Sequence, residues 1–301
     1  MSIEAFAGCE KCVVIESSEL KVVVTLNCGP RIIGLIHKGN GVNLMKTYPD
    51  ELANPTGDSF KLYGGHRLWA SPEIPGYTDD ADNEPVEYSE ADGWHTFTSV
   101  SKGAQLGKSI SLRVEGSSVH LNHRLTNLAQ ETVHIAPWCL TVLDEGGIGL
   151  TPQPEFKAHT EELLPARPLV LWAYTNMSDP RVQWGRRLIR LQQTAGMKPF
   201  KYGAFVEQGF AGFYLSGSLF IKRFAADPDE EYPDFGCNFE TFTREEMIEV
   251  ESVGHMAYLE TGESVSQSET WGVFLSDAPP ADEDQAREWF DGFASRVPAL
   301  P

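Results

Sequence analysis

The chain has 301 residues, of which 41% are hydrophobic and 22% charged, and this composition is typical of a globular protein and excludes a disordered one. Its net charge of −19, from 43 acidic and 24 basic residues, makes nucleic acids and anionic membranes unsuitable partners. There is no apolar run of the roughly 18 residues that a transmembrane helix needs, no signal peptide, and an odd number of cysteines, five, so we expect a cytoplasmic protein without a disulfide framework.

Short strand-like runs follow one another along most of the chain. They are rich in Val, Ile, Thr and aromatic residues, and Gly, Pro, Asn or Asp separates most of them. Dense strands without long helical stretches predict an all-β sandwich or barrel. The predicted strand runs are 11–17, 20–27, 31–37, 94–101, 109–115, 118–127, 132–143, 168–174, 203–224, 238–243, 247–253, 255–260 and 269–276.

Three further segments complete the predicted organisation. Residues 73–93 are acidic and lack periodicity, which is typical of a long loop, and such loops often cover a functional site. Residues 181–193 fit either a helix or a strand, and their neighbours favour a strand. Residues 281–297 follow two prolines and carry one apolar stripe, which predicts a C-terminal helix packed on a sheet. Since no repeat or linker is visible, we predict a single domain over 1–301.

Motifs for metals and cofactors are weak in this sequence. Cys9 and Cys12 form a Cys-x-x-Cys pair, but no second pair and no paired histidines accompany them. There is no P-loop and no Gly-x-Gly-x-x-Gly motif. We therefore expect neither a metal nor a cofactor.

The segment GGHRLWASPE, residues 64–73, has the highest density of residues suited to a binding site. His66 offers a titratable imidazole, Arg67 a rigid fork of donors, and Trp69 a flat apolar face that suits the C–H face of a sugar. The same residues also fit a turn that buries a hydrogen-bonded His–Arg pair and a core tryptophan. The segment alone leaves both interpretations open.

Three other residues are also candidates for a binding site. Trp138 lies in a predicted strand beside a proline, where it is either a core residue or a binding platform. Lys201 begins a strand, a position that is usually exposed to solvent. Arg31 begins a strand after a Gly-Pro turn.

Three glutamates occupy two successive strand runs near the C-terminus. Side chains alternate along a strand, so Glu249 and Glu251 lie on one face, and a hairpin would bring Glu240 close to them across the ladder. Like charges so close together are unfavourable on a bare sheet, but in a cleft burial and proximity raise carboxylate pKa values towards neutrality. The alternative is a solvated strand face in an acidic protein.

The order of these segments resembles the galactose mutarotase-like superfamily, to which aldose 1-epimerases belong, and most closely an uncharacterised branch of it, a domain of unknown function. The resemblance implies an all-β fold, a large antiparallel β-supersandwich whose concave face binds a small-molecule carbohydrate. Thr261 stands where the family's closing turn usually has proline. The matching stretches are NCGPRI, GGHRLWASPE, APWCLTVL, KYGAF, YPDFGCNFETFT, IEVESVG and LETGESVSQSETWGVF, from about residue 20 to 275.

The resemblance also implies roles for individual residues. In sugar mutarotases a glutamate on a late strand takes the proton of the anomeric hydroxyl while a histidine protonates the ring oxygen. Glu251 best matches that base, and Glu249 is the reserve. Trp138 stands where the middle-strand histidine is expected, so His66 is the candidate acid, with His123 and His134 on neighbouring runs. The candidate catalytic residues are therefore Glu251 and His66, and the candidate substrate-binding residues are Arg31, Arg67, Trp69, Trp138, Lys201, Glu240 and Glu249.

Three functions fit these residues. The first is an aldose 1-epimerase or related carbohydrate epimerase, which requires a base and an acid and no metal. The second is a carbohydrate-binding or sensor domain, which keeps the tryptophans and cations but lacks the acid–base pair. The third is a glycoside-cleaving enzyme, in which two of the glutamates form a carboxylate pair.

Overall fold

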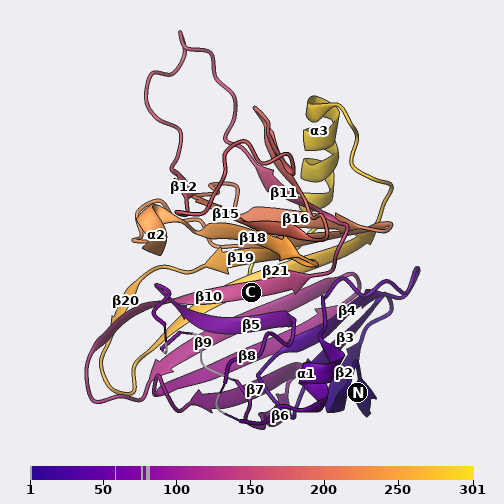
Figure 1. The fold of residues 1–301 in the computed structure, drawn as a ribbon, viewed down its shortest axis with the longest axis vertical. Coiled ribbons are helices and arrows are strands. Elements are labelled where there is room, and N and C mark those ends of the chain that lie inside the picture. Colours follow the sequence, from indigo (N-terminus) through magenta and orange to yellow (C-terminus); the bar gives the residue numbers. More distant parts are fainter. Residues whose placement is uncertain (1, 58, 76, 79–81) are drawn as a thin grey trace.

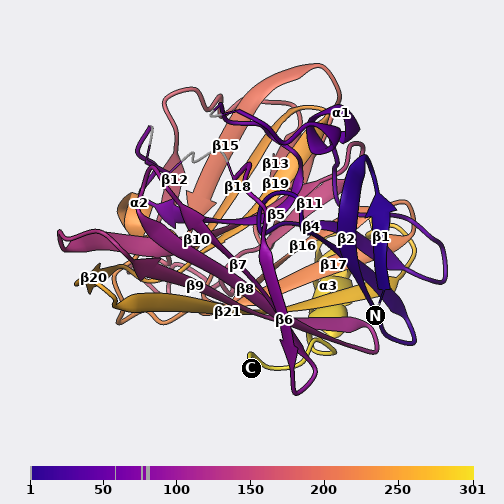
Figure 2. The same cartoon turned by 90° about the horizontal axis from the view of Figure 1, so that it is seen from below.

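Two antiparallel β-sheets that face each other make up most of the structure (Figures 1 and 2). A computed structural model of the chain describes residues 2–57, 59–75, 77–78 and 82–301. The predicted loop 73–93 therefore lies partly outside the described residues, and its last part forms strand β6 (Glu87–Ala91). The all-β architecture predicted from the density of short strands is confirmed.

The first sheet has 11 strands in the order β1-β2-β3-β4-β5-β10-β19-β18-β15-β12, and β20 pairs with β10 outside this path. The N-terminal strands occupy one end of the sheet and late strands the other, so β10 joins distant parts of the chain. The strands are β1 (Ser2–Phe6), β2 (Cys9–Glu16), β3 (Leu20–Thr25), β4 (Ile32–His37), β5 (Gly65–Ser71), β10 (Val133–Leu143), β12 (Leu169–Leu171), β15 (Met197–Ala204), β18 (Phe239–Glu245), β19 (Met247–Val253) and β20 (Ala257–Leu259).

The second sheet has 10 strands in the order β13-β14-β11-β16-β17-β21-β9-β8-β7-β6. Residues 181–193 form two of these strands, as their neighbours in the sequence suggested. In addition to β6, the strands are β7 (Trp94–Ser101), β8 (Leu106–Glu115), β9 (Ser118–Asn127), β11 (Ile148–Pro152), β13 (Val182–Trp184), β14 (Leu188–Gln192), β16 (Phe210–Leu215), β17 (Ser218–Phe224) and β21 (Ser264–Leu275).

Strand β5 is the most consequential element that the sequence did not predict. Gly64 and Gly65 both have positive φ, of 80° and 69°, which is why glycines open this strand. All seven residues of β5 are buried, so the strand has no polar alternation by which to recognise it. The segment, for which a turn was one of the two open interpretations, is therefore a central strand whose residues are buried on both faces.

The core fills the space between the two sheets. From the first sheet, Leu68 and Val250 contribute buried side chains, and Leu121, Phe220 and Trp271 contribute from the second. Each is at most 1% exposed. Burying apolar area in this way is the main favourable term for the fold, at roughly 25 cal/mol per Å².

The predicted C-terminal helix is α3 (Glu283–Ala294), and it packs on the outer side of the second sheet (Figure 2). Asp282 caps it by accepting a hydrogen bond from the backbone N–H of Gln285 at 3.0 Å. Phe290 lies over Gly212, where a Cβ atom would come within 2.6 Å of the ring. The helix rests on Leu150, Leu188, Phe210, Leu219, Ile221 and Phe274.

The other helices are short, α1 (Pro49–Ala53) and α2 (Pro233–Gly236). Among the described residues, no helix combines the length and the apolar character needed to cross a bilayer.

Candidate functional site

The strand register gathers the candidate residues on the outer face of the first sheet. Trp138 of β10 lies opposite Trp69 of β5, and Leu140 lies between Arg67 and Glu251. Because Leu68 and Val250 point into the core, their chain neighbours point away from the second sheet. The strands that carry these residues, β5, β10, β19, β18 and β15, lie side by side in Figure 1.

The hairpin predicted for the glutamates is present in the structure. Glu240 of β18 pairs directly with Glu251 of β19, and Phe242 pairs with Glu249. All three glutamates therefore share the outer face, and each is at most 5% exposed. This arrangement excludes a solvated strand face as the explanation of their spacing.

Lys201 of β15 lies between two of these carboxylates. Its Nζ is 2.6 Å from Glu240 Oε2 and 3.2 Å from Glu251 Oε2. Trp138 donates a hydrogen bond from Nε1 to the same oxygen of Glu251 at 2.9 Å. The ammonium also lies 4.7 Å from the ring centre of Trp138 and 4.5 Å from that of Trp172, within the range of cation–π attraction.

Arg67 and Glu249 form a second ion pair on the same face. Arg67 Nη1 lies 3.2 Å from Glu249 Oε1. The guanidinium stacks over Trp69, with Cζ 4.2 Å from the ring centre. Trp69 in turn meets Trp138 edge to face at 5.8 Å, so the aromatic rings connect the two ion pairs.

Several polar atoms of this face are buried without a hydrogen-bond partner among the described residues. They include Oε1 of Glu240, Oε1 of Glu251, Nε of Arg67 and Nε1 of Trp69. A buried polar group without a partner costs about 1–3 kcal/mol. Four such atoms on one face, both donors and acceptors, are suited to a ligand that carries several hydroxyl groups.

Burial and crowding change the acidity of the groups on this face. Burial raises the pKa of Glu240 to about 8, with repulsion from Glu251 adding to the rise and Lys201 opposing it. Burial likewise raises the pKa of Glu249 against the attraction of Arg67. For Lys201, burial acts to lower the pKa, but the neighbouring Glu240 and Glu251 outweigh it and the pKa is raised. The raised pKa of Glu240 favours its protonated form near neutrality, and the raised pKa of Lys201 keeps the ammonium charged.

Arg31 lies beside this cluster and holds a loop in place. Its Nη1 donates to the carbonyl oxygens of Gly64 at 2.7 Å and Leu62 at 3.3 Å. Its Nη2 lies 3.7 Å from the Asp82 carboxylate. These contacts fix the chain that leads into β5.

His66 lies on the opposite face of β5 from Arg67, between the two sheets. Its Nδ1 lies 2.9 Å from Thr141 Oγ1, and its Nε2 lies 2.7 Å from Nε2 of His123. The expectation that His66 and Glu251 flank one sugar therefore does not match their placement, because successive residues of a strand point to opposite faces. Among the residues that the structure describes, the hydrogen bonds and ion pairs of Glu251 go to Trp138 and Lys201 and not to a histidine.

His66 is part of a hydrogen-bonded network that joins the inner faces of the two sheets. Lys222 Nζ donates to the Cys139 carbonyl oxygen at 2.6 Å and to Thr141 Oγ1 at 3.1 Å, and lies 3.1 Å from Glu269 Oε1. His123 Nδ1 lies 3.1 Å from the Gln267 carbonyl oxygen and so donates to it. This donor direction leaves His123 Nε2 to accept from His66 Nε2, and the Thr141 hydroxyl to donate to His66 Nδ1.

Ligand atoms of His66, His123 and Glu269 lie within 4.8 Å of one another, which is the spacing of a metal site. The same atoms are already used in hydrogen bonds, and the Lys222 ammonium beside Glu269 would repel a cation. The sequence did not lead us to Lys222 or Glu269. Each lies two residues from a core residue of the same strand, Lys222 from Phe220 and Glu269 from Trp271, and this spacing marks both as inward-facing.

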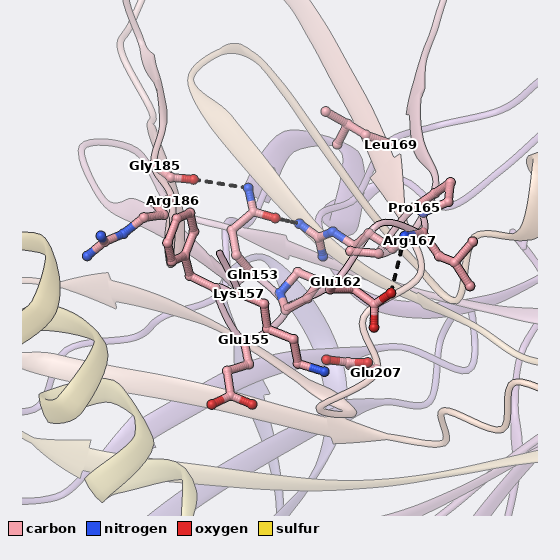
Figure 3. Close-up of a pocket in the computed structure, with 14 residues that line it drawn as sticks. Gln153, Glu155, Lys157, Glu162, Pro165, Arg167, Leu169, Gly185, Arg186 and Glu207 are labelled. Atoms are coloured by element: carbon pink, nitrogen blue, oxygen red, sulfur yellow. Dashed lines mark hydrogen bonds between the residues drawn. The ribbon is translucent and has the colours of Figure 1, made fainter. Parts of the chain in front are cut away.

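A cavity of about 810 Å³ lies away from these residues, beside the loop 153–167 (Figure 3). Two of the polar side chains around it are used in hydrogen bonds to the backbone: Gln153 donates from Nε2 to the Gly185 carbonyl oxygen at 3.1 Å, and Arg167 Nη1 donates to the Pro152 carbonyl oxygen at 3.2 Å. Arg186 stacks over Phe156 at 4.8 Å. We therefore assign the candidate site to the outer face of the first sheet.

Comparisons with known proteins bear on the fold. No protein-family model matches the chain, and no curated protein sequence matches it. Solved structures do match, among them a galactose mutarotase-like protein from Lactobacillus casei, with a TM-score of 0.58 and 12% identity over 87% of this chain and 100% of that one. The Slr1438 protein from Synechocystis has a TM-score of 0.61 and 12% identity over 92% and 100%. An Escherichia coli K12 protein assigned provisionally as an aldose 1-epimerase has a TM-score of 0.61 and 10% identity over 88% and 99%.

Proposed function

We propose that this chain, which has the galactose mutarotase-like fold, binds a carbohydrate on the outer face of its first sheet and exchanges the sugar's anomers. The observation that carries the proposal is the cluster in which Lys201 lies between Glu240 and Glu251. The two carboxyl groups lie side by side near tryptophan rings, and the Oε1 atom of each is buried without a hydrogen-bond partner among the described residues.

The proposed reaction needs one proton acceptor and one proton donor. Glu251 takes the proton of the hydroxyl group on C1 while Glu240 gives its proton to the ring oxygen. The bond between C1 and the ring oxygen breaks, and C1 becomes an aldehyde. After rotation about the C1–C2 bond, the reverse transfers close the ring as the other anomer and restore both glutamates.

Two carboxyl groups on one sheet face can serve both transfers because the hydroxyl oxygen and the ring oxygen are bonded to the same carbon. Glu251 Oε1 has no hydrogen-bond partner among the described residues and is the accepting atom. Glu240, with its pKa raised to about 8, is the donor at neutral pH. Lys201 stabilises the negative charge on whichever carboxylate is ionised.

Substitution of the base tests the proposal. We expect Glu251→Gln to keep the fold and sugar binding but to slow anomer exchange by about 10²–10⁴-fold, because the amide does not accept the proton. The rate is followed by polarimetry or by NMR saturation transfer on aldoses that the wild-type protein binds. Glu288→Gln, on the exposed side of α3, is the matched control and should leave the rate unchanged. Exchange by Glu251→Gln at the wild-type rate would refute Glu251 as the base.

A carbohydrate-binding protein without catalysis is the second candidate. The observation that favours it is the pair of donors, Trp138 Nε1 and Lys201 Nζ, which both hold Oε2 of Glu251 and stabilise it as a fixed acceptor. In that case the wild-type protein binds aldoses in calorimetry but does not accelerate exchange for any of them. The same pair of measurements thus separates the two functions.

A further inference from the structure

The turn that leads into β18 has an unusual backbone. Asp234, Phe235 and Gly236 follow one another with φ values of 50°, 61° and 93°. This left-handed conformation suits glycine and is tolerated by aspartate, but for a bulky residue such as phenylalanine it is a strained outlier. The hydrogen bond from Cys237 N to the Pro233 carbonyl oxygen, 2.9 Å long, closes the turn.

This conformation holds Phe235 in solvent. Its side chain is 91% exposed, the highest value of any large hydrophobic residue described. The turn is firmly anchored, since Pro233 and Cys237 on either side of it are buried. Next to it, Asn238 bonds the backbone of Val206 through both its Oδ1 and its Nδ2. The exposure is therefore built into the fold and does not come from a loose loop.

The same turn borders the candidate site. Asp234 Oδ2 accepts a hydrogen bond from Ser71 Oγ at 3.4 Å, and Ser71 shares the outer face of β5 with Trp69. The Asp234 carboxylate is also close enough to add to the raised pKa of Glu240. In Figure 1 the turn, labelled α2, lies at the end of β18 and β15.

We propose that Phe235 is the platform of a second sugar subsite, so that the substrate is a reducing oligosaccharide and not only a free monosaccharide. This inference rests on the proposed function, since the reducing end would occupy the Glu240–Glu251 site. An exposed aromatic ring next to a carboxylate suits a second sugar ring, which offers an apolar C–H face and hydroxyl groups at its rim. The strained backbone of the turn then has a function, because it holds the Phe235 ring where a second sugar would bind.

Paired ligands test this subsite. Calorimetry compares glucose and galactose with the reducing disaccharides maltose, cellobiose and lactose on the wild-type protein. We expect at least one disaccharide to bind about three- to tenfold more tightly than its reducing-end monosaccharide. Phe235→Ala should remove that difference and leave monosaccharide affinity within about twofold, whereas Phe235→Trp should retain it. Phe156→Ala, which removes an exposed phenylalanine in the loop 153–167, is the control and should change neither affinity.

A stability measurement tests whether the backbone strain at Phe235 serves ligand binding and not folding. Phe235→Gly should melt at a higher temperature than Phe235→Ala, because glycine adopts positive φ without strain and alanine does not. It should also lose the preference for disaccharides. A preference that survives Phe235→Ala overturns the inference. The inference is also overturned if the wild-type protein binds monosaccharides and disaccharides equally well. In that case the proposed function still stands. Binding of neither class refutes the proposed function itself.

Discussion

The outer face of the first sheet carries three carboxyl groups and two cations within one buried cluster. Lys201 pairs with Glu240 and Glu251, and Arg67 pairs with Glu249. With every carboxyl group ionised the cluster would have an uncompensated negative charge, which is expensive in a buried position. One proton on Glu240 balances it. The proton that the proposed reaction requires is therefore also the one that makes the cluster neutral.

This balance predicts how the reaction depends on pH. Glu240, with its pKa raised to about 8, is protonated below that pH and loses its proton above it, so anomer exchange should fall as pH rises through about 8. The rate is measured from pH 6 to 10 with sugar well below saturation, because kcat/KM reports the pKa values of the free protein. Glu240→Gln should be slow at every pH and should lack the fall near pH 8. If the rate of Glu240→Gln still falls near pH 8, the titrating group is not Glu240.

Lys201 should be essential for stability as well as for function. Lys201→Met keeps the length of the side chain but leaves the buried Glu251 carboxylate without its cation, and removal of one partner from a buried pair costs about 3–5 kcal/mol. Urea unfolding measures the loss. Combining Lys201→Met with Glu251→Gln removes the unpaired charge, so the double variant should be more stable than the sum of the single effects predicts. Simple additivity would contradict the coupling.

At the scale of single elements, the hairpin of β18 and β19 was the part of the site that the sequence predicted best. Two strands with a short turn and strict alternation leave little freedom, so Glu240 faces Glu251 as expected. The side of β5 on which His66 lies was not predictable in this way. Both faces of β5 are buried, and the register that turns Arg67 outward comes from β10, about 70 residues later in the chain.

Helix α3 shows the same contrast between a local pattern and its tertiary context. Its apolar stripe predicted a docked helix, and the structure adds where it docks, over Gly212 on the outer side of the second sheet. The strands beneath it gave no sign of this contact, since a sheet face covered by a helix and one covered by another sheet are equally apolar.

The packing of α3 gives a test at this scale. Phe290 is fully buried against the second sheet, so Phe290→Ala should lower the free energy of unfolding by about 3–5 kcal/mol. Denaturant unfolding followed by tryptophan fluorescence measures it. Glu288→Ala, two residues earlier and exposed, is the control and should have an effect within about 0.5 kcal/mol. Equal effects of the two substitutions would show that the helix is not docked as described.

At the scale of the whole molecule, the two sheets are joined by polar groups as well as by apolar packing. His66, His123, Lys222 and Glu269 meet in the middle of the sandwich, and the hydrogen bonds among their neighbours leave one proton between the two imidazoles. Burial lowers the pKa of both histidines, and the nearby Lys222 charge adds to this effect, while for His123 the Glu269 carboxylate opposes it. Protonation of either ring would place a second positive charge beside that lysine.

This network predicts a loss of stability in acid. In the unfolded chain the histidines take up protons below about pH 6.5, whereas in the folded chain their lowered pKa values keep them neutral. Their contribution to stability is thus complete above pH 6.5 and is lost as pH falls, by up to about 1.4 kcal/mol per pH unit for each histidine. Glu240, with its raised pKa, contributes a slope of the opposite sign in this range, so urea unfolding between pH 7.5 and 5 is compared between the wild-type protein and His123→Gln. The wild-type protein should lose more stability than His123→Gln as pH falls, and equal slopes would assign the acid sensitivity elsewhere.

The central position of β10 has a consequence for the synthesis of this protein. Its Trp138 bonds Glu251, 113 residues further along the chain, while its other edge pairs with β5. At about 5–20 residues per second, a ribosome needs roughly 6 to 23 s to add that stretch. Throughout this time the nascent chain presents one unpaired edge of β10, rich in apolar side chains and open to association with other chains. The two halves of the candidate site meet only after β19 has been synthesised, so a chain that terminates before β19 lacks half of the site and keeps this edge of β10 open to association.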